Sequence, residues 1–258
     1  DFSDVSPQFT VAYHIVPKEP VYITATRGFK AGGFNSASPT GREAYGEEHS
    51  WNYEAGAKTS WLGERLSANA AVFYLDWQDL QVNVPSPAVP GQFYIANAAG
   101  ATSKGVELEV NARPMPGLDL FGVVGYTDAR FRSGSVSSGA EVGGNKLAHA
   151  PDYTADVGVQ ASRAVSRSMT LFARAELVRY GDYQYDDANT RGQTAYSLTN
   201  LRAGVRGRRA FAEGWVRNAF DTRYVPIAFA YNPGLAPSGF IGESGAPRTF
   251  GVRAGLSF

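Results

Sequence analysis

The segment Trp51-Asn52-Tyr53-Glu54-Ala55-Gly56-Ala57-Lys58-Thr59-Ser60-Trp61 alternates between two kinds of side chain. Odd positions carry aromatic rings at both ends and small residues between them, whereas even positions are polar or glycine. Successive side chains of a strand point to opposite faces, so this strand would have one apolar and one polar face. Ten residue steps of about 3.3 Å, tilted by about 40°, span roughly 25 Å, the height of the apolar band in a membrane barrel. The pattern predicts a membrane-spanning β-strand.

The last residues of the chain repeat this alternation. From Phe250 to Phe258 every second residue is apolar, and the residues between them are small or polar. In a soluble sandwich the apolar face of such a strand packs against a second sheet, whereas in an outer-membrane barrel it meets lipid. A terminal strand that ends on an aromatic residue favours the barrel.

The composition fits an all-β membrane protein and excludes several other classes. The chain has 258 residues, of which 24 are basic and 24 acidic, so no net charge attracts it to nucleic acid. No run of 18 apolar residues is present, which excludes transmembrane helices, and no amphipathic helical stripe is recognisable. The 29 glycines and the 13% of aromatic residues suit tight turns and interfacial rings. There is no cysteine, and the first seven residues resemble a loop rather than a signal peptide.

The same alternation recurs along the chain and predicts about eleven strands. Short turns near residues 17, 62, 114, 164 and 207 are interleaved with long loops near residues 35, 85, 135, 187 and 235. Short turns on one rim and long loops on the other are typical of a transmembrane antiparallel up-and-down β-barrel. The expected strands cover approximately residues 8–16, 21–26, 51–61, 66–82, 101–113, 118–131, 153–162, 169–177, 200–206, 210–220 and 250–258. The two faces of the strand at 118–131 are similarly apolar, so its orientation stays open.

An odd number of strands does not close a bacterial barrel in the usual way. Single-chain bacterial barrels have even strand counts, and an open edge in lipid leaves unsatisfied amides that each cost several kcal/mol. We therefore expect further strands from elsewhere to complete the barrel.

Several stretches resemble the C-terminal half of the β-barrel of a TonB-dependent outer-membrane receptor, a family whose barrels have 22 strands. Their order and spacing together carry the resemblance, which covers essentially residues 1–258. The stretches are 22–35 (YITATRGFKAGGFN), 51–58 (WNYEAGAK), 97–109 (NAAGATSKGVELE), 125–129 (GYTDA), 149–151 (HAP), 218–224 (NAFDTRY) and 247–258 (PRTFGVRAGLSF).

The resemblance implies the last eleven strands of such a receptor, in the Gram-negative outer membrane, with extracellular long loops and a periplasmic C-terminus. The plug domain, the TonB-binding segment and the first half of the barrel would lie in another part of the protein or in a second chain. The implied function is TonB-dependent import of a scarce nutrient, most often a ferric siderophore. Lipid, lipopolysaccharide, the plug and the TonB complex are the implied partners, and no cofactor is expected. A passive porin or a surface adhesin is the alternative.

The long loops carry the candidate ligand-binding residues. Aromatic faces together with a few cations suit an iron chelate or another flat, anionic ligand. Ordinary loop packing or lipopolysaccharide contact explains any single one of these residues equally well. The candidates are the aromatic residues Tyr183, Tyr185, Phe229, Tyr231 and Phe240 and the cations Arg132, Lys146 and Arg191.

Charged residues on the polar faces of the strands are candidates for contact with a plug or a ligand in the barrel lumen. A structural cross-strand charge ladder is the interpretation that we favour for them. An alternating set of arginines suggests an anion pathway, but pairing with lumen or plug carboxylates is the preferred explanation. The charged candidates are Glu54, Lys58, Glu107, Glu109, Arg174, Glu176, Arg202 and Arg253, and the alternating arginines are Arg202, Arg206, Arg217 and Arg253.

No motif in the sequence supports catalysis or a metal site. The three histidines, His14, His49 and His149, lack metal-ligand spacing. The acidic loop around residues 182–189 has oxygen ligands for calcium but does not match the helix-loop-helix pattern, so a solvated loop is preferred. No nucleophile elbow, phosphate loop or carboxylate pair is recognisable. We expect the protein not to be an enzyme.

Overall fold

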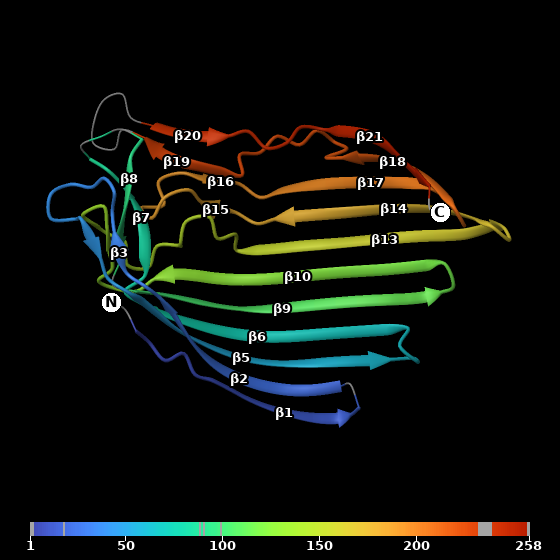
Figure 1. Cartoon of the computed structure of the whole chain (residues 1–258), viewed down its shortest axis with the longest axis horizontal. Helices are drawn as coiled ribbons and strands as arrows, with labels where there is room; N and C mark the ends of the chain where they lie inside the picture. The colour runs from blue at the N-terminus through green and yellow to red at the C-terminus, as the bar shows by residue number, and fades with distance from the viewer. Residues whose placement is uncertain are drawn as a thin grey trace.

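The computed structural model describes residues 3–17, 19–87, 89, 91–98, 100–231 and 239–256, and within them the main element is one antiparallel sheet of eleven strands. Each strand lies beside the next main strand along the chain, so the sheet is a continuous up-and-down meander (Figure 1). This arrangement confirms the predicted all-β class and number of strands. The strands are β1 (Gln8–Val16), β2 (Glu19–Lys30), β5 (Glu48–Trp61), β6 (Leu66–Gln78), β9 (Gly100–Met115), β10 (Leu118–Phe131), β13 (Tyr153–Ser166), β14 (Met169–Tyr180), β17 (Tyr196–Gly207), β18 (Ala210–Arg217) and β21 (Thr249–Leu256).

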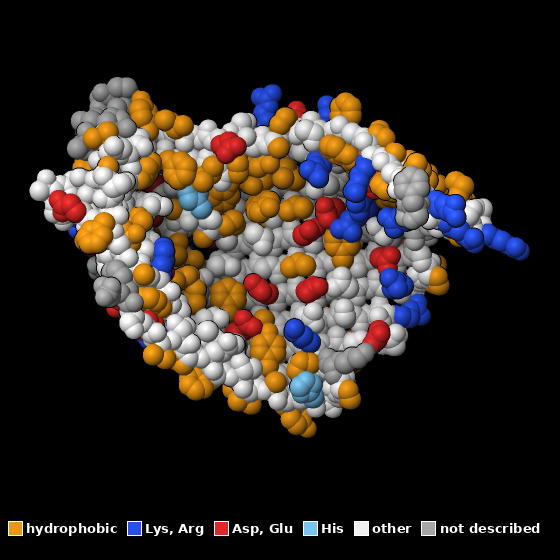
Figure 2. All heavy atoms as spheres, viewed as in Figure 1, with side chains coloured by type: hydrophobic (Ala, Val, Ile, Leu, Met, Phe, Trp, Pro, Cys, Tyr) orange, Lys and Arg blue, Asp and Glu red, His pale blue; other side chains and the backbone are white. Residues whose placement is uncertain are grey.

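The sheet curves into a trough with a polar concave face and an apolar convex face. Figure 2 looks onto the hollow, where acidic and basic side chains gather. The convex face exposes aliphatic side chains along its whole width, such as Val11, Ile23, Val72 and Leu108. The alternation predicted for β5 is present, since Trp51 and Tyr53 stack on the same face with ring centroids 6.0 Å apart. In β21 the alternation holds to Leu256, whereas Phe258 lies outside the described residues.

The pairing of β10 with its neighbours gives the orientation that its own sequence leaves open. Val123 is opposite Glu109 on one side and Asp156 on the other, whereas Val124 is opposite Leu108 and Ala155. Residues opposite one another in a ladder share a face. Val123 therefore belongs to the concave face and Val124 to the convex face.

The two ends of the sheet differ, as the spacing of turns and loops predicts. All the short turns lie at one end, together with the end of β21, and the long loops lie at the other end (Figure 1). The turn after β5 reverses the chain through three residues with positive φ, Leu62, Gly63 and Glu64. The turn after β9 places Gly117 at a φ of 83°, and a Cβ there would overlap the carbonyl oxygen of Ser162.

Each long loop contains a two-stranded sheet that the sequence does not predict. These five hairpins lie outside the main sheet, at its loop end (Figure 1). Each hairpin satisfies part of the backbone hydrogen bonding of its own loop. They are β3 (Gly33–Phe34) with β4 (Ala44–Tyr45), β7 (Gln81–Pro85) with β8 (Phe93–Asn97), β11 (Val136–Ser137) with β12 (Ala140–Glu141), β15 (Tyr183–Gln184) with β16 (Gly192–Gln193), and β19 (Ile227–Tyr231) with β20 (Gly239–Glu243).

Two predicted strands run past the ends of the observed strands, and several others are longer in the structure than predicted. The strand expected to run from Leu66 to Val82 ends at Gln78, because Asp79 has a φ of 54° and the chain turns into β7. The strand expected over 210–220 ends at Arg217, because Asn218 also has a positive φ. Backbone in this left-handed region cannot continue a pleated ladder. In both places the main strand ends where the long loop begins.

The most buried side chains lie in the long loops and at the loop end of the main strands, as Ala101 of β9 and Phe131 of β10 show. Ala98, Phe131 and Val142 form a small apolar cluster at the loop end, with Leu80 and Leu147 packed against it. A single curved sheet has no second layer to bury its apolar face, so aliphatic residues on the convex face stay open. Within the described residues, no helix is long and apolar enough to cross a bilayer.

Candidate functional site

The charged residues predicted to share the polar face do so. Cross-strand register joins Lys58 to Asn69 and on to Glu109, and joins Glu176 to Asn200. Their common face is the concave one, which Figure 2 shows. The set placed there by register is Glu54, Lys58, Glu107, Glu109, Arg174, Glu176, Arg202 and Arg253.

Several of the concave-face carboxylates are held by neighbours within the sheet. The Tyr22 hydroxyl donates a 2.7 Å hydrogen bond to Glu54, and the Asn69 amide donates a 3.2 Å hydrogen bond to Glu109. Arg174 forms a 2.8 Å ion pair with Glu176. These contacts fit the structural cross-strand ladder that the sequence favours, and they fix the side chains of the wall.

The sequence favours pairing of the arginines of this wall with lumen or plug carboxylates, and pairing with a plug stays a prediction. Among the described residues, no ion pair joins Arg202, Arg206, Arg217 or Arg253 to any carboxylate. Each guanidinium instead lies over an aromatic ring. The carbon-to-centroid distances are 5.9 Å for Arg202 over Phe172, 5.5 Å for Arg206 over Phe172, 5.2 Å for Arg217 over Trp215 and 5.3 Å for Arg253 over Phe211.

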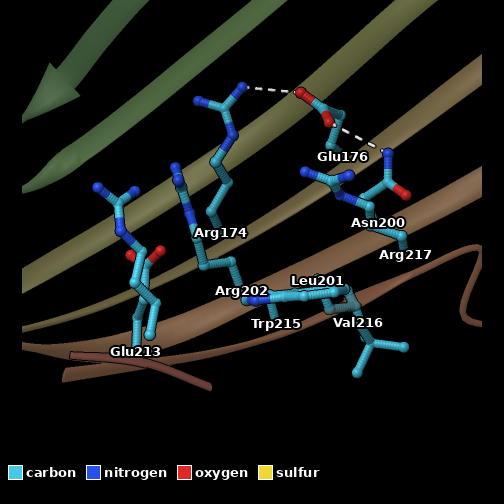
Figure 3. A pocket seen from close by; sticks show the side chains of 10 residues that line it. Arg174, Glu176, Asn200, Leu201, Arg202, Glu213, Trp215, Val216 and Arg217 are labelled. Atoms are coloured by element: carbon cyan, nitrogen blue, oxygen red, sulfur yellow. Dashed lines mark hydrogen bonds and ion pairs between the residues drawn. The ribbon is translucent and has the colours of Figure 1, made fainter. Parts of the chain in front are cut away.

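A cavity of about 520 Å³ is lined by four arginines, one each on β14, β17, β18 and β21: Arg174, Arg202, Arg217 and Arg253. Arg206 does not line it. Figure 3 shows Arg174 and Arg202 projecting side by side from neighbouring strands into the same space, with Glu213 beside them. Asn200 donates a 3.3 Å hydrogen bond to Glu176, which already pairs with Arg174. The cavity wall therefore holds one internally satisfied ion pair and several further cations.

A second cavity, of about 410 Å³, lies among the long loops. Two of the predicted ligand-binding aromatics, Tyr185 and Phe229, line it. The ring of His149 is 6.2 Å from that of Tyr185 and 5.9 Å from that of Phe229, while Phe93 meets Phe229 edge-on at 5.6 Å. We name these four residues, from four different loops, the loop aromatic cluster.

The other predicted aromatics lie beside this cavity rather than in its wall. Tyr183 is 4% exposed, and its hydroxyl donates to the carbonyl groups of Val225 and Pro226, so it ties two loops together. Phe240 contacts Tyr185 at 6.4 Å, and Tyr231 ends β19 at the edge of the described residues. Burial raises the pKa of the Tyr183 hydroxyl, which stays protonated and acts as a donor.

The predicted cations do not line the loop cavity. Arg132 forms an ion pair with Asp76, and Lys146 forms one of 2.5 Å with Asp152. The backbone amide of Arg191 donates to Asp186 at 3.3 Å, and the residue is exposed. Two of the three predicted cations are therefore paired with aspartates, and none of the three faces this cavity.

Sequence reasoning missed three residues that the loop cavity brings together. His149 was considered as a metal ligand and Asp187 as a calcium ligand, and Phe93 drew no attention within its proline-rich loop. Burial raises the pKa of the Asp187 carboxyl, although the Ser137 hydroxyl donates to it at 2.7 Å. Burial, which disfavours the charged imidazolium, lowers the pKa of His149, and the nearby Asp187 carboxylate opposes this effect. The available signal was the concentration of aromatic residues in the long loops.

The acidic loop at residues 182–189 uses its oxygen atoms for hydrogen bonds within the loops. Asp186 accepts from the amide and hydroxyl of Thr190, and Asp182 accepts from the amide of Ala195. Asn189 accepts from the amide of Lys146 and donates to its carbonyl group. In the described part of the chain, no group of three or more histidine or acidic residues has a geometry that suits a metal ion.

A family model matches the sequence over most of its length. The model describes a TonB dependent receptor-like β-barrel and matches residues 1–219. The chain belongs to this family. Its members are outer-membrane β-barrel receptors rather than enzymes.

Two curated relatives of this TonB-dependent receptor chain are receptors for metal chelates. The metal-pseudopaline receptor CntO of Pseudomonas aeruginosa is 30% identical over 124 residues, which are 48% of this chain and 16% of CntO. The ferric-pyoverdine 358 receptor of Pseudomonas putida is 30% identical over 128 residues, which are 49% of this chain and 15% of that receptor. The chain thus matches only a small part of each relative.

Solved receptor structures share the fold. The ferric yersiniabactin uptake receptor FyuA from Yersinia pestis superposes with a TM-score of 0.82 at 24% identity, covering 97% of this chain and 37% of FyuA. The siderophore receptor PiuA from Acinetobacter baumannii superposes with a TM-score of 0.72 at 18% identity, covering 96% of this chain and 35% of PiuA. This TonB-dependent receptor chain therefore spans about a third of each solved receptor.

Proposed function

We propose that this chain is the C-terminal part of the β-barrel of an outer-membrane receptor that imports a ferric siderophore by TonB-dependent transport. The observation that carries the proposal is the loop cavity, in which the loop aromatic cluster surrounds a space of about 410 Å³. Cavities of this size lined by rings and a few polar groups are typical of small-molecule sites. The curated relatives, which are named as receptors for metal chelates, support the same class of ligand.

The edges of the sheet support a barrel that is completed by other strands. Within the described residues, β1 pairs on one side with β2, and β21 pairs on one side with β18. The unpaired amides of both edges would be costly in lipid, so each edge would pair with a further strand. We place the first half of the barrel, the plug domain and the TonB-binding segment in the remaining part of the receptor. The long loops would be extracellular and the C-terminus periplasmic.

The proposed mechanism involves binding and conformational change, without chemistry on the ligand. The loop aromatic cluster would capture the chelate, and a plug displaced by TonB would then open a path along the concave face. The exposed aliphatic residues of the convex face, including Val72 and Leu108, would contact lipid. Lipopolysaccharide would surround the loop end.

Uptake of iron-55 chelates by iron-starved cells tests this function. Siderophores from the organism's own iron-starved medium are loaded with iron-55 and offered to cells that carry the full-length receptor, with or without TonB. We expect uptake that requires both proteins, and about tenfold or greater loss of apparent affinity on Phe229→Ala, because a ring buried by a ligand contributes one to several kcal/mol. The control is Phe220→Ala, which removes a ring that is 78% exposed.

The alternatives predict other results. Uptake that persists without TonB would indicate a passive porin, and no uptake at all would indicate an adhesin. Equal affinities of the Phe229→Ala and Phe220→Ala receptors would show that the loop cavity is not the capture site. Intact mass of the receptor extracted from outer membranes would show whether this chain is continuous with the rest of the barrel.

A further inference from the structure

Four arginines on the concave face stand in successive rows of the sheet. In the order of the rows from the loop end, they are Arg217, Arg202, Arg253 and Arg206. Arg217 is opposite Thr249, Arg202 opposite Trp215, Arg253 opposite Glu213, and Arg206 opposite Phe211. Same-face rows lie two residues apart, or about 6.7 Å, so the four span roughly 20 Å along the strands. We name this set the arginine ladder.

Aromatic rings hold the guanidinium groups of the ladder in place. Each group lies over the ring of Phe172, Trp215 or Phe211 at 5.2 to 5.9 Å. Stacking on a ring uses the face of the planar guanidinium and leaves its N–H edge free. That edge presents a fixed fork of donors that matches the two oxygens of a carboxylate.

The charge of the ladder is not balanced within the sheet. The carboxylates that line the cavity are Glu176 and Glu213. Glu176 is occupied by Arg174 and Asn200, and among the described residues no ion pair involves Glu213 or a ladder arginine. Figure 3 shows Arg202 projecting from its strand into the cavity, beside Arg174 of the neighbouring strand. A cavity of about 520 Å³ with surplus positive charge suits a small anion.

We propose that the arginine ladder binds carboxylate groups of a small anionic ligand and passes them from row to row along the concave face. The proposal rests on the import function above and adds that the imported chelate carries carboxylates. Successive sites of moderate strength favour entry and still allow exit, as in other selective pores. The loop cavity, with its rings and acidic Asp186 and Asp187, would hold an uncharged part of the same chelate.

Citrate is the probe for this site, because it carries several carboxylates on one small molecule. Its binding is measured by calorimetry on the full-length receptor, purified from outer membranes in detergent. The test variant is Arg202→Gln with Arg253→Gln, and the control is Arg208→Gln with Arg209→Gln, which removes the same charge from an exposed turn. We expect the test variant to bind citrate at least tenfold more weakly, with a reduced dependence on salt, and the control to match the unmodified receptor.

Two results would overturn the proposal. Equal affinity of the test and control variants would place citrate elsewhere. Absence of citrate binding by the unmodified receptor, together with a lowered melting temperature of the test variant, would show that acidic groups of a polypeptide in the lumen occupy the ladder. Iron-55 uptake separates failure of this proposal from failure of the proposed function. A receptor that imports iron but does not bind citrate would support the import function and contradict carboxylate binding by the arginine ladder.

Discussion

The orientation of β10 gives a sharp test of which face of the sheet meets lipid. Val123 and Val124 are adjacent, identical in type and similarly open, with exposed fractions of 49% and 43%. Both lie near the middle of the strand Leu118–Phe131. Replacement of either by arginine therefore introduces the same charge at the same depth, with room for the longer side chain, but on opposite faces.

The expected energies differ because the surroundings differ. An arginine at 124 would lie between Leu108 and Ala155 on the convex face, where a charge near the midplane of a bilayer costs about 2–4 kcal/mol. An arginine at 123 would lie between Glu109 and Asp156 in a polar surrounding, where partly exposed ion pairs contribute about 0–1 kcal/mol. We expect Val124→Arg to reduce the folding equilibrium constant roughly 30- to 1000-fold and Val123→Arg to change it little.

Equilibrium urea unfolding of the full-length receptor in phospholipid vesicles, followed by tryptophan fluorescence, measures both variants. Val123→Leu and Val124→Leu are the controls for a change of size without charge. Equal costs for the two arginines, or a larger cost at 123, would refute the assignment of the convex face to lipid.

Two further predictions concern packing and ionisation. Gly158→Ala should lower receptor stability by about 1–3 kcal/mol, because its Cβ would overlap the Phe121 ring and lie 2.8 Å from the Ala175 carbonyl oxygen. On gels, this variant should lose the compact form of the receptor at a lower temperature than the unmodified protein does. Gly214→Ala is the control, because its Cβ would have no atom nearer than 4.0 Å, and it should melt like the unmodified receptor. Asp187→Asn should slow hydrogen exchange of the loop amides at neutral pH and have no effect near pH 3. Burial raises the pKa of the folded carboxyl, so its contribution to loop stability is lost as pH rises from the unfolded value through the folded one; a slowing of equal size at both pH values would contradict this account.

Strand number and connectivity were predictable because they depend on local patterns. Alternation over ten residues is visible within a single strand such as Trp51–Trp61, and most of the short turns contain glycine or proline. The orientation of β10 was not predictable, because both of its faces are apolar and only pairing with Glu109 and Asp156 distinguishes them. Face assignment there is a property of the sheet, not of the strand.

The contacts of the arginines and of the loops depend on register and on tertiary packing. Arg253 stacks on Phe211, a contact between two strands that sequence spacing does not reveal. Arg132 and Lys146 were predicted to be available to an anionic ligand, but Arg132 pairs with Asp76 of β6 and Lys146 pairs with Asp152 of its own loop. The loop hairpins escaped prediction because some of their strands are only two residues long, too short for any periodicity.

The five loop hairpins are structurally separate from the eleven-stranded sheet that carries them. Each hairpin forms its own backbone ladder, and none of its strands pairs with the eleven-stranded sheet. A mutation, insertion or exchange in one hairpin therefore leaves the register of the main strands unchanged, and the loop aromatic cluster draws its rings from four such loops. Under the proposed function, the loops that bind the ligand can therefore change one at a time during evolution, while the eleven-stranded sheet is inherited unaltered.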